Sequence, residues 1–152
     1  MALGYTWSLP IEDKHLYSKT KFLDEISQLL AGREAEKIIF GETTTGAEND
    51  LKKATKIARD MVRIYGMSDK IGPIVFGERE ELVFLGRELG EHANYSDKTA
   101  AEVDEEVSKI IHDSEKKAHD VLTKNRLLLK KITTKLLKDE TIEGAEFDKM
   151  FK

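Results

Sequence analysis

The sequence contains no cysteine, which excludes disulfide bonds and cysteine metal ligands. It has no apolar run that approaches the roughly 18 residues of a membrane span, and no G-x-x-x-x-G-K-[S/T] phosphate-binding loop. A formal net charge of −4, without basic residues interleaved with aromatics, gives no footprint for nucleic acid. We therefore expect a soluble segment that contacts neither a membrane nor nucleic acid and does not itself bind ATP.

Proline is also scarce, and no glycine-, serine- or proline-rich linker divides the 152 residues. With 39% hydrophobic residues the chain can bury one core, so a single domain is expected. The charged residues, 36% of the chain, carry both signs interspersed, as on the solvated surface of helices.

Apolar residues recur with helical spacing along most of the chain, which predicts a mainly α-helical fold. Ser18 is a candidate N-cap with Tyr17 and Phe22 at the spacing of a hydrophobic staple, which predicts a helix over Lys19–Ala31. Further helices are expected over Glu34–Phe40 after a break or turn at Gly32, over Thr45–Gly66, over a long segment capped by Ser96 or Asp97, over a segment capped by Asn125, and over a short segment after Thr141. Residues 67–95 have irregular patterning with short apolar runs, which predicts a long loop with possible strand fragments.

The two ends of the chain each leave an alternative open. Ala2–Leu9 has strand-like composition, and that strand could belong to the core or present an edge to an extended polypeptide. The apolar helix capped by Asn125 and the short apolar helix after Thr141, joined by a short turn, predict an antiparallel C-terminal hairpin. Its leucine-rich seam would face either the core or another subunit.

One acidic residue, Asp50, falls on an unexpected side of its helix. Thr45 and Glu48 have the spacing of a capping box, which predicts a helix start near Thr45. On the helical wheel Asp50 lies at the edge of the apolar arc, between Ile57 and Met61. It is either a helix-start acid that the positive end of the dipole favours, or an acid with a metal-binding or catalytic role.

Several motifs in order resemble the peptidase domain of the FtsH family, the membrane-anchored ATP-dependent zinc metalloproteases. The resemblance covers nearly the whole chain and rests mainly on Ala2–Thr6, Leu29–Glu36, Ile39–Gly41, Thr44–Leu51, Ala58–Val62, Gly66–Ser68, Val83–Arg87, Asp104–Val107 and Glu140–Ile142. Many separate motifs in one order are more specific than any single motif.

The resemblance implies roles for two acids. Asp50 matches the aspartate that is the third protein ligand of the catalytic zinc, the other two ligands being histidines of an H-E-x-x-H helix. Glu36 matches a glutamate that supports the zinc site from behind, by holding a ligand histidine. The resemblance also implies polypeptide substrates, a ring of six peptidase domains, and a parent protein at the cytoplasmic face of the bacterial inner membrane.

The sequence departs from the family at the centre of the chemistry, because none of its four histidines belongs to an H-E-x-x-H motif. They are His15, His92, His112 and His119. His112 and His119, seven residues apart on the charged side of their helix, are expected to face water. The chain thus resembles the latter part of a peptidase domain, with the zinc-site half at 1–66, the irregular loop at 67–95 and the C-terminal helices at 96–152.

The expected function is therefore one part of an ATP-dependent zinc metalloendopeptidase that degrades unfolded or membrane proteins. The chain has no catalytic residue of its own, so alone it is expected neither to hold catalytic zinc nor to cleave peptides. ATP would act in an ATPase module outside this chain. The alternative is a non-catalytic helical assembly or adaptor module derived from such a peptidase.

Overall fold

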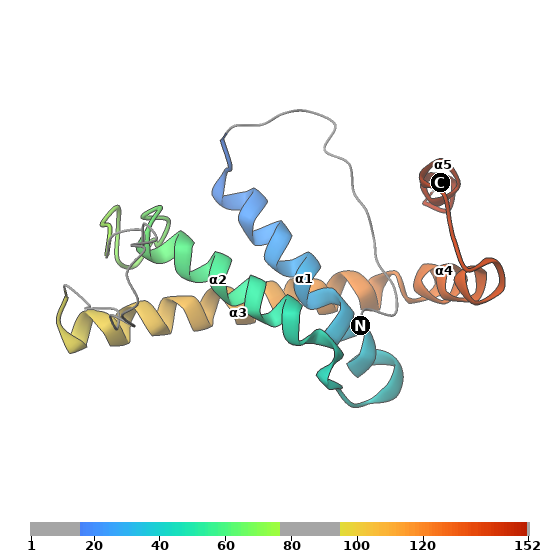
Figure 1. Cartoon of the computed structure of the whole chain (residues 1–152), viewed down its shortest axis with the longest axis horizontal. Helices are drawn as coiled ribbons and strands as arrows, with labels where there is room; N and C mark the ends of the chain where they lie inside the picture. The colour runs from blue at the N-terminus through green and yellow to red at the C-terminus, as the bar shows by residue number, and fades with distance from the viewer. Residues whose placement is uncertain (1–15, 77–94, 152) are drawn as a thin grey trace, which may run out of the picture.

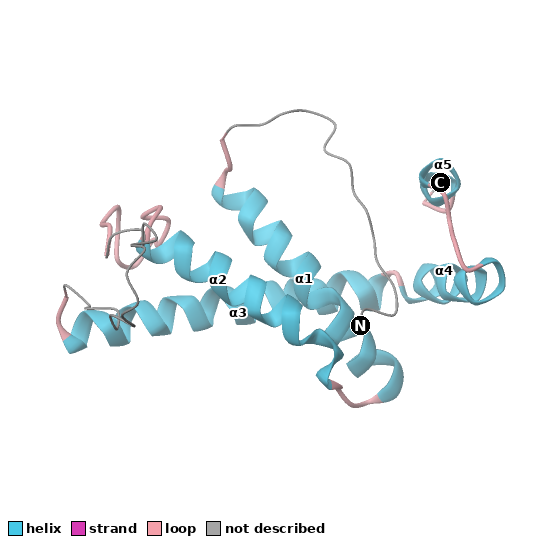
Figure 2. Ribbon diagram, viewed as in Figure 1, coloured by secondary structure: helices cyan, strands magenta, loops and turns pink. Residues whose placement is uncertain are grey.

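The computed structural model describes residues 16–76 and 95–151, which are almost entirely helical (Figures 1 and 2). The helices are α1 (Lys19–Phe40), the 3-10 helix η1 (Thr45–Ala47), α2 (Glu48–Arg63), α3 (Asp97–Lys124), α4 (Arg126–Asp139) and α5 (Gly144–Lys149). These two stretches contain no β-strand, only an isolated bridge between Ser68 and Gly72. The mainly α-helical fold class is confirmed.

Several predicted features lie outside the described residues. These are the strand at Ala2–Leu9, the strand fragment at 82–85, and the histidines His15 and His92. The other expected strand fragment, at residues 74–76, is not a strand. Within 16–76 and 95–151, no helix is both long and apolar enough to cross a membrane.

The core is formed where α1 and α2 pack against each other and against the long helix α3. In the view of Figure 1, α3 passes behind both. Each helix buries apolar residues spaced three or four apart, as expected for amphipathic helices. The core side chains are Ile26 and Leu30 of α1, Ala54, Ala58, Met61 and Val62 of α2, and Val103 and Val107 of α3. Burial of this shared face provides the main stabilisation of the fold.

The start of α1 follows the prediction closely. Ser18 caps the helix, its Oγ accepting a hydrogen bond from the Lys21 N–H at 3.2 Å. Tyr17 stacks on Phe22 with ring centroids 5.4 Å apart, which is the hydrophobic staple expected at this spacing. Phe22 stacks in turn on Tyr65, also at 5.4 Å, so the staple joins the beginning of α1 to the residues just after α2.

The predicted break at Gly32 is wrong, because α1 continues from Lys19 to Phe40 as one helix. An interior glycine costs only about 0.5–1 kcal/mol relative to alanine, which tertiary packing on both sides of it offsets. The helix ends instead at Gly41, whose φ of 76° is left-handed, with its N–H donating to the Lys37 carbonyl at 3.0 Å.

A charge network joins α1 to α3 beside this core. The Glu34 side chain is buried, and the residue as a whole is only 3% exposed. Lys37 Nζ lies 2.7 Å from Glu34 Oε1 and 2.6 Å from Glu115 Oε1, while Arg33 Nη1 lies 2.9 Å from the same Glu115 oxygen. His119 Nδ1 lies 3.3 Å from Glu34 Oε2. Arg33 and Lys37 thus neutralise Glu34 on their own helix and Glu115 across the α1–α3 interface.

The turn after α2 is fixed by a buried polar contact. Ser68 Oγ donates to Glu106 Oε2 of α3 at 2.6 Å and accepts from the Ile71 N–H at 3.0 Å. Both Ser68 and Glu106 are buried. Since a buried carboxylate is costly without a donor, this pair holds the chain after α2 against α3.

The C-terminal helices depart from the prediction. Figure 1 shows α4 extending beyond the end of α3, and α5 lying across the direction of α4 instead of running back along it, so α4 and α5 form no antiparallel hairpin. Asn125 is the N-cap residue of α4, as predicted, but its side chain makes no capping hydrogen bond to that helix. Its Nδ2 donates instead to the Val121 carbonyl at 2.8 Å and so closes the end of α3. A short helix after Thr141, α5, is confirmed, and a Lys135–Glu146 ion pair at 2.7 Å joins it to α4.

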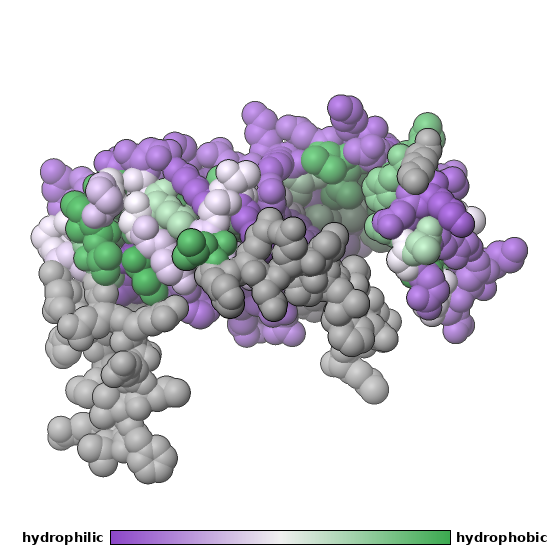
Figure 3. All heavy atoms as spheres, turned by 90° about the horizontal axis from the view of Figure 1, so that it is seen from above, coloured by the Kyte–Doolittle hydropathy of each residue, from purple (hydrophilic) through white to green (hydrophobic). Residues whose placement is uncertain are grey.

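The leucine seam of α4 is not part of the core, because neither α4 nor α5 contains a buried residue. Leu127 and Leu137 are 87% and 81% exposed. Figure 3 shows apolar surface on this C-terminal portion, at the right of the view. The alternative in which this seam faces the core is therefore wrong.

The histidines of α3 behave as predicted. His112 is exposed, with Nδ1 2.8 Å from the Ser108 carbonyl oxygen one turn earlier. His119 is also exposed and approaches Glu34 as described above. The two rings are occupied locally, and the described residues contain no group of three or more histidines and acids able to hold a metal.

Two glycines of α1 should respond oppositely to the same substitution. Gly41→Ala forces a left-handed conformation on alanine and should destabilise the protein by about 1–2 kcal/mol. Gly32→Ala should stabilise it by about 0.5–1 kcal/mol, since an added Cβ there meets nothing within 4 Å. Urea unfolding followed by circular dichroism measures both; equal effects of the same sign would contradict the single-helix description of α1.

The α1–α3 charge network predicts a pH dependence of stability. The hydrogen bond from Lys37 holds the pKa of Glu115 below its ordinary value of 4.5. An acid with a lowered pKa in the folded state contributes stability that is present above its unfolded pKa and lost as pH falls through the folded value. Glu115→Gln should therefore destabilise the protein at pH 7 by about 0.2–1 kcal/mol. The difference should shrink as pH falls below 4.5 and vanish only once pH lies below the lowered pKa of Glu115.

The control for this change is Glu102→Gln on the same helix, where the carboxylate lies 3.9 Å from Lys98 in an exposed pair. It should leave the free energy of unfolding nearly unchanged from pH 7 to pH 3. Denaturant melts of both variants across that pH range make the measurement. A Glu115→Gln deficit that persists undiminished at pH 3 would show that the network does not act through this ionisation.

Candidate functional site

The two acids implied by the family resemblance lie on either side of the connection between α1 and α2. Glu36 belongs to the last two turns of α1, and Asp50 to the first turn of α2. Gly41 ends α1 in a left-handed conformation, which reverses the chain. The connecting residues consequently return beside Glu36 before α2 begins.

Glu36 is half-buried and holds the connecting loop with both carboxylate oxygens. Its Oε2 accepts the Thr44 N–H at 3.0 Å, and its Oε1 accepts the Thr44 hydroxyl at 2.9 Å. Hydrogen bonds to an ionised carboxylate are stronger than those between neutral groups. The structure thus gives Glu36 a partner in this chain, Thr44, that the sequence did not suggest.

The start of α2 differs in detail from the predicted capping box. Thr44, not Thr45, supplies the cap: its Oγ1 accepts the Gly46 N–H at 3.2 Å, at the start of η1. Helix α2 follows directly, with Ala47 as its N-cap and no side-chain cap of its own. Glu48 pairs with Lys52 at 2.5 Å instead of turning back to Thr45. A helix start in this region is confirmed, but the reciprocal Thr45–Glu48 cap is wrong.

Asp50 is half-buried in the first turn of α2. Its side chain has no hydrogen bond or ion pair within residues 16–76 and 95–151. The neighbouring positions Lys53 and Ala54 are exposed and fully buried respectively, so Asp50 sits at the border of the packed face, as the helical wheel indicates. Acidic side chains are common in the first turn of a helix, because the positive end of the helix dipole attracts them.

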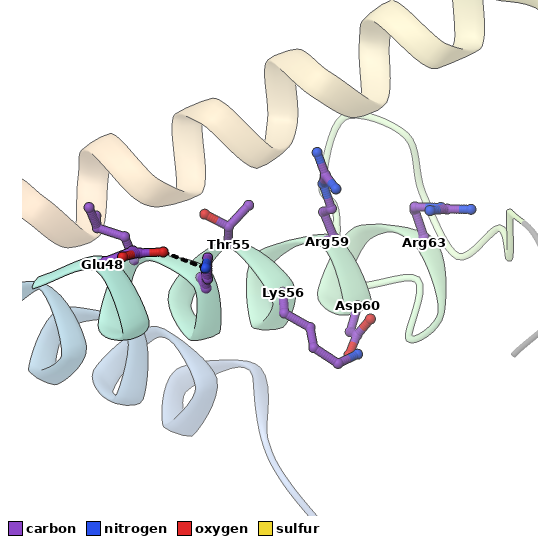
Figure 4. A pocket seen from close by; sticks show the side chains of 8 residues that line it. Glu48, Thr55, Lys56, Arg59, Asp60 and Arg63 are labelled. Atoms are coloured by element: carbon purple, nitrogen blue, oxygen red, sulfur yellow. Dashed lines mark hydrogen bonds and ion pairs between the residues drawn. The ribbon is translucent and has the colours of Figure 1, made fainter. Parts of the chain in front are cut away.

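The charged side of α2 lines an open groove that does not include Asp50 (Figure 4). Within it Glu48 pairs with Lys52, and Lys56 with Asp60 at 3.0 Å, each one turn apart. Such exposed pairs are usual on the solvated face of a helix and contribute a few tenths of a kcal/mol. The groove is therefore separate from the candidate site.

The donor chemistry at Asp50 fits zinc in part. A carboxylate oxygen is an accepted zinc ligand, but a catalytic zinc needs three protein ligands and an open position. The described residues supply no further histidine or acid close enough to complete such a set. The chain therefore offers one suitable ligand and cannot by itself make a complete site from these residues.

Sequence reasoning missed two residues near this site. Glu34 continues the buried Ile26–Leu30 stripe of α1 at a spacing of four, a signal hidden by the assumed break at Gly32. Thr44 stands eight residues after Glu36, and no local pattern shows that the chain reverses to bring them together. The available signal for that reversal was the glycine at position 41, because glycine readily adopts the left-handed conformation that Gly41 has in the structure.

Comparison with known proteins gives consistent matches along the chain. Residues 1–150 match Peptidase family M41. The sequence is 54% identical to the ATP-dependent zinc metalloprotease FtsH 3 of Petrotoga mobilis over 145 residues, covering 95% of this chain and 22% of that protein. It is 48% identical to the ATP-dependent zinc metalloprotease FtsH of Thermotoga maritima over 145 residues, covering 95% of this chain and 24% of that protein.

A third relative, the ATP-dependent zinc metalloprotease FtsH of Caldicellulosiruptor bescii, is 50% identical over 147 residues, covering 97% of this chain and 24% of the relative. The chain thus spans about a quarter of the length of these relatives. The matches run through both candidate acids and the helices that carry them. On this basis the chain belongs to peptidase family M41, together with the FtsH metalloproteases.

Proposed function

We propose that this chain is part of an ATP-dependent zinc metalloprotease, in which Asp50 is one protein ligand of the catalytic zinc. The observation that carries the proposal is the half-buried carboxylate in the first turn of α2, which no side chain of the described residues engages. Acids in such positions are normally paired or serve a function. Membership of family M41 supports zinc binding as the function of Asp50.

Glu36 supports the same site from the end of α1. Each carboxylate oxygen has two lone pairs, and Thr44 uses one on each oxygen. Glu36 can therefore hold the loop and still accept a hydrogen bond from a ligand histidine, as the family resemblance implies. Such outer contacts fix the orientation of a metal-binding imidazole.

The remaining ligands are proposed to be the two histidines of an H-E-x-x-H helix, a motif that this sequence does not contain. Zinc held by two histidines and Asp50 would supply Lewis-acid chemistry for peptide hydrolysis. Without the histidines, the described residues do not form a metal site. The 152 residues alone are therefore proposed to be inactive as a peptidase.

The partners and setting of the complete protein are also proposals. The names of the relatives indicate a protease driven by ATP, so we propose unfolded or membrane polypeptides as substrates, with ATP acting outside this chain. We further propose a ring of six peptidase domains at the cytoplasmic face of the bacterial inner membrane. The exposed leucines of α4 offer apolar area to such an assembly.

The zinc role of Asp50 is tested by Asp50→Asn in the full-length product of the gene that encodes this chain. Bound zinc and ATP-dependent casein hydrolysis are the measurements. Loss of a residue behind a metal ligand costs roughly 10–100-fold, so loss of the ligand itself should reduce hydrolysis more than about 100-fold and release zinc. ATP hydrolysis should continue.

The matched control is Glu48→Gln, which removes another acid from the first turn of α2. It alters the helix-dipole interaction by the same kind of change, roughly 0.3–1 kcal/mol, but leaves Asp50 in place. Its zinc content and hydrolysis should stay within about twofold of wild type. Full activity of Asp50→Asn would refute the ligand role and favour the non-catalytic assembly or adaptor module.

A further inference from the structure

We propose that Thr44 is the positioning residue for Asp50: locked to Glu36, it fixes the first turn of α2 and thereby the direction in which Asp50 presents its carboxylate. The inference rests on the proposed function, because it assigns a further residue to the same site. Thr44 would touch neither zinc nor substrate. Its effect would pass through the backbone of η1.

The Thr44 hydroxyl links two elements because it donates and accepts at once. It donates to Glu36 Oε1 at 2.9 Å and accepts the Gly46 N–H at 3.2 Å. The Thr44 N–H adds a third bond, to Glu36 Oε2 at 3.0 Å. A hydroxyl group can donate and accept at the same time, as both roles require here. We call these three bonds the Thr44 latch.

The latch matters because, among the residues that the structure describes, no side chain caps the start of α2 directly. The N-cap Ala47 offers no side-chain hydrogen bond, and this residue is itself almost fully buried. The last side chain that engages the backbone before α2 is therefore Thr44. A Cβ added at Gly46 would lie 3.3 Å from Thr44 Oγ1, which shows how closely the hydroxyl fits against the turn.

The backbone of this turn sets the direction in which the Asp50 side chain points. It lies six residues after Thr44 in the first turn of α2, and no contact among the described side chains holds it. Metal ligands must be placed within about 0.2 Å of their ideal distances. A first turn that shifts would therefore misplace the carboxylate, even though the core residues Ala54 and Ala58 stay buried.

The test compares Thr44→Val, which keeps the shape but removes the hydroxyl, with Thr44→Ser, which restores it. Thr43→Val is the control: it is the same change one residue earlier in the loop, at a threonine whose side chain forms no hydrogen bond within the described residues. All three variants are made in the full-length gene product. The wild-type protein is measured alongside.

Two measurements separate a local from a positioning effect. Hydrogen exchange in zinc-free protein, on a peptide covering residues 41–50, should be about tenfold faster in Thr44→Val, as expected for a lost hydrogen bond. Zinc affinity by chelator competition should fall roughly 10–100-fold, the range for residues that act behind a metal ligand. kcat for a peptide substrate should fall while KM stays within about twofold.

Thr44→Ser should recover zinc affinity and kcat to within about threefold, and Thr43→Val should match wild type. Faster exchange in Thr44→Val with unchanged zinc affinity and kcat would reduce the latch to a structural cap and overturn the proposal. Unchanged exchange would show that the latch does not hold the turn, which also overturns it.

The proposed function fails separately, if the wild-type protein binds no zinc. In that case the positioning role of Thr44 fails with it, while the exchange measurement in zinc-free protein still reports whether the latch exists. Zinc binding that depends on Asp50 but not on Thr44 would leave the proposed function intact and reject the further inference alone.

Discussion

Close packing of the small-residue face of α2 is the constraint on which the structure depends. Ala54 and Ala58 are both fully buried where α2 meets α1 and α3. Because an alanine side chain is a single methyl group, the neighbouring backbones can approach closely, and larger side chains there would overpack the interface. Met61 and Val62 extend the same face toward the end of α2. The packing of α2 on α1 and α3 therefore determines the position of Asp50.

The connection between α1 and α2 places Glu36 and the start of α2 close together, and so defines the candidate site. Only seven residues separate Phe40 from Glu48, and Gly41 reverses the chain at their beginning. Glu36 then holds Thr44 with two hydrogen bonds. The same carboxylate that the family resemblance relates to a zinc ligand thus also organises the loop. Scaffold and site share one side chain here.

Much of the fold could be predicted from local pattern. The start of α1 was predicted from Ser18 as N-cap and from the spacing of Tyr17 and Phe22. The capping hydrogen bond and the aromatic stack are both formed. The apolar periodicity of α2 located its buried face, including the border position of Asp50. These features depend on residues within one or two turns of each other, which a sequence displays directly.

The predictions that were wrong, and the contacts that were missed, depended on interactions between segments distant in the sequence. Gly32 does not break α1, because packing of Ile26 and Leu30 on one side and the Glu34–Lys37 network on the other keeps the helix continuous. Glu34 was not recognised as buried, since its compensating partners include side chains of α3. The Glu36–Thr44 contact likewise requires a chain reversal. The leucines of α4 are as periodic as core residues, and pattern alone could not show that no other helix of residues 16–76 and 95–151 covers them.

The joint at Asn125 gives the C-terminal portion a freedom that the three-helix core lacks. One residue separates α3 from α4, and neither α4 nor α5 buries a side chain. A helix of 14 residues is about 21 Å long at 1.5 Å per residue, so a bend of about 20° at its base displaces its far end by about 7 Å. Such a swing would break no core contact. The arm formed by α4 and α5 can therefore adjust to a contacting surface at little energetic cost, while α1, α2 and the connection between them keep their shape.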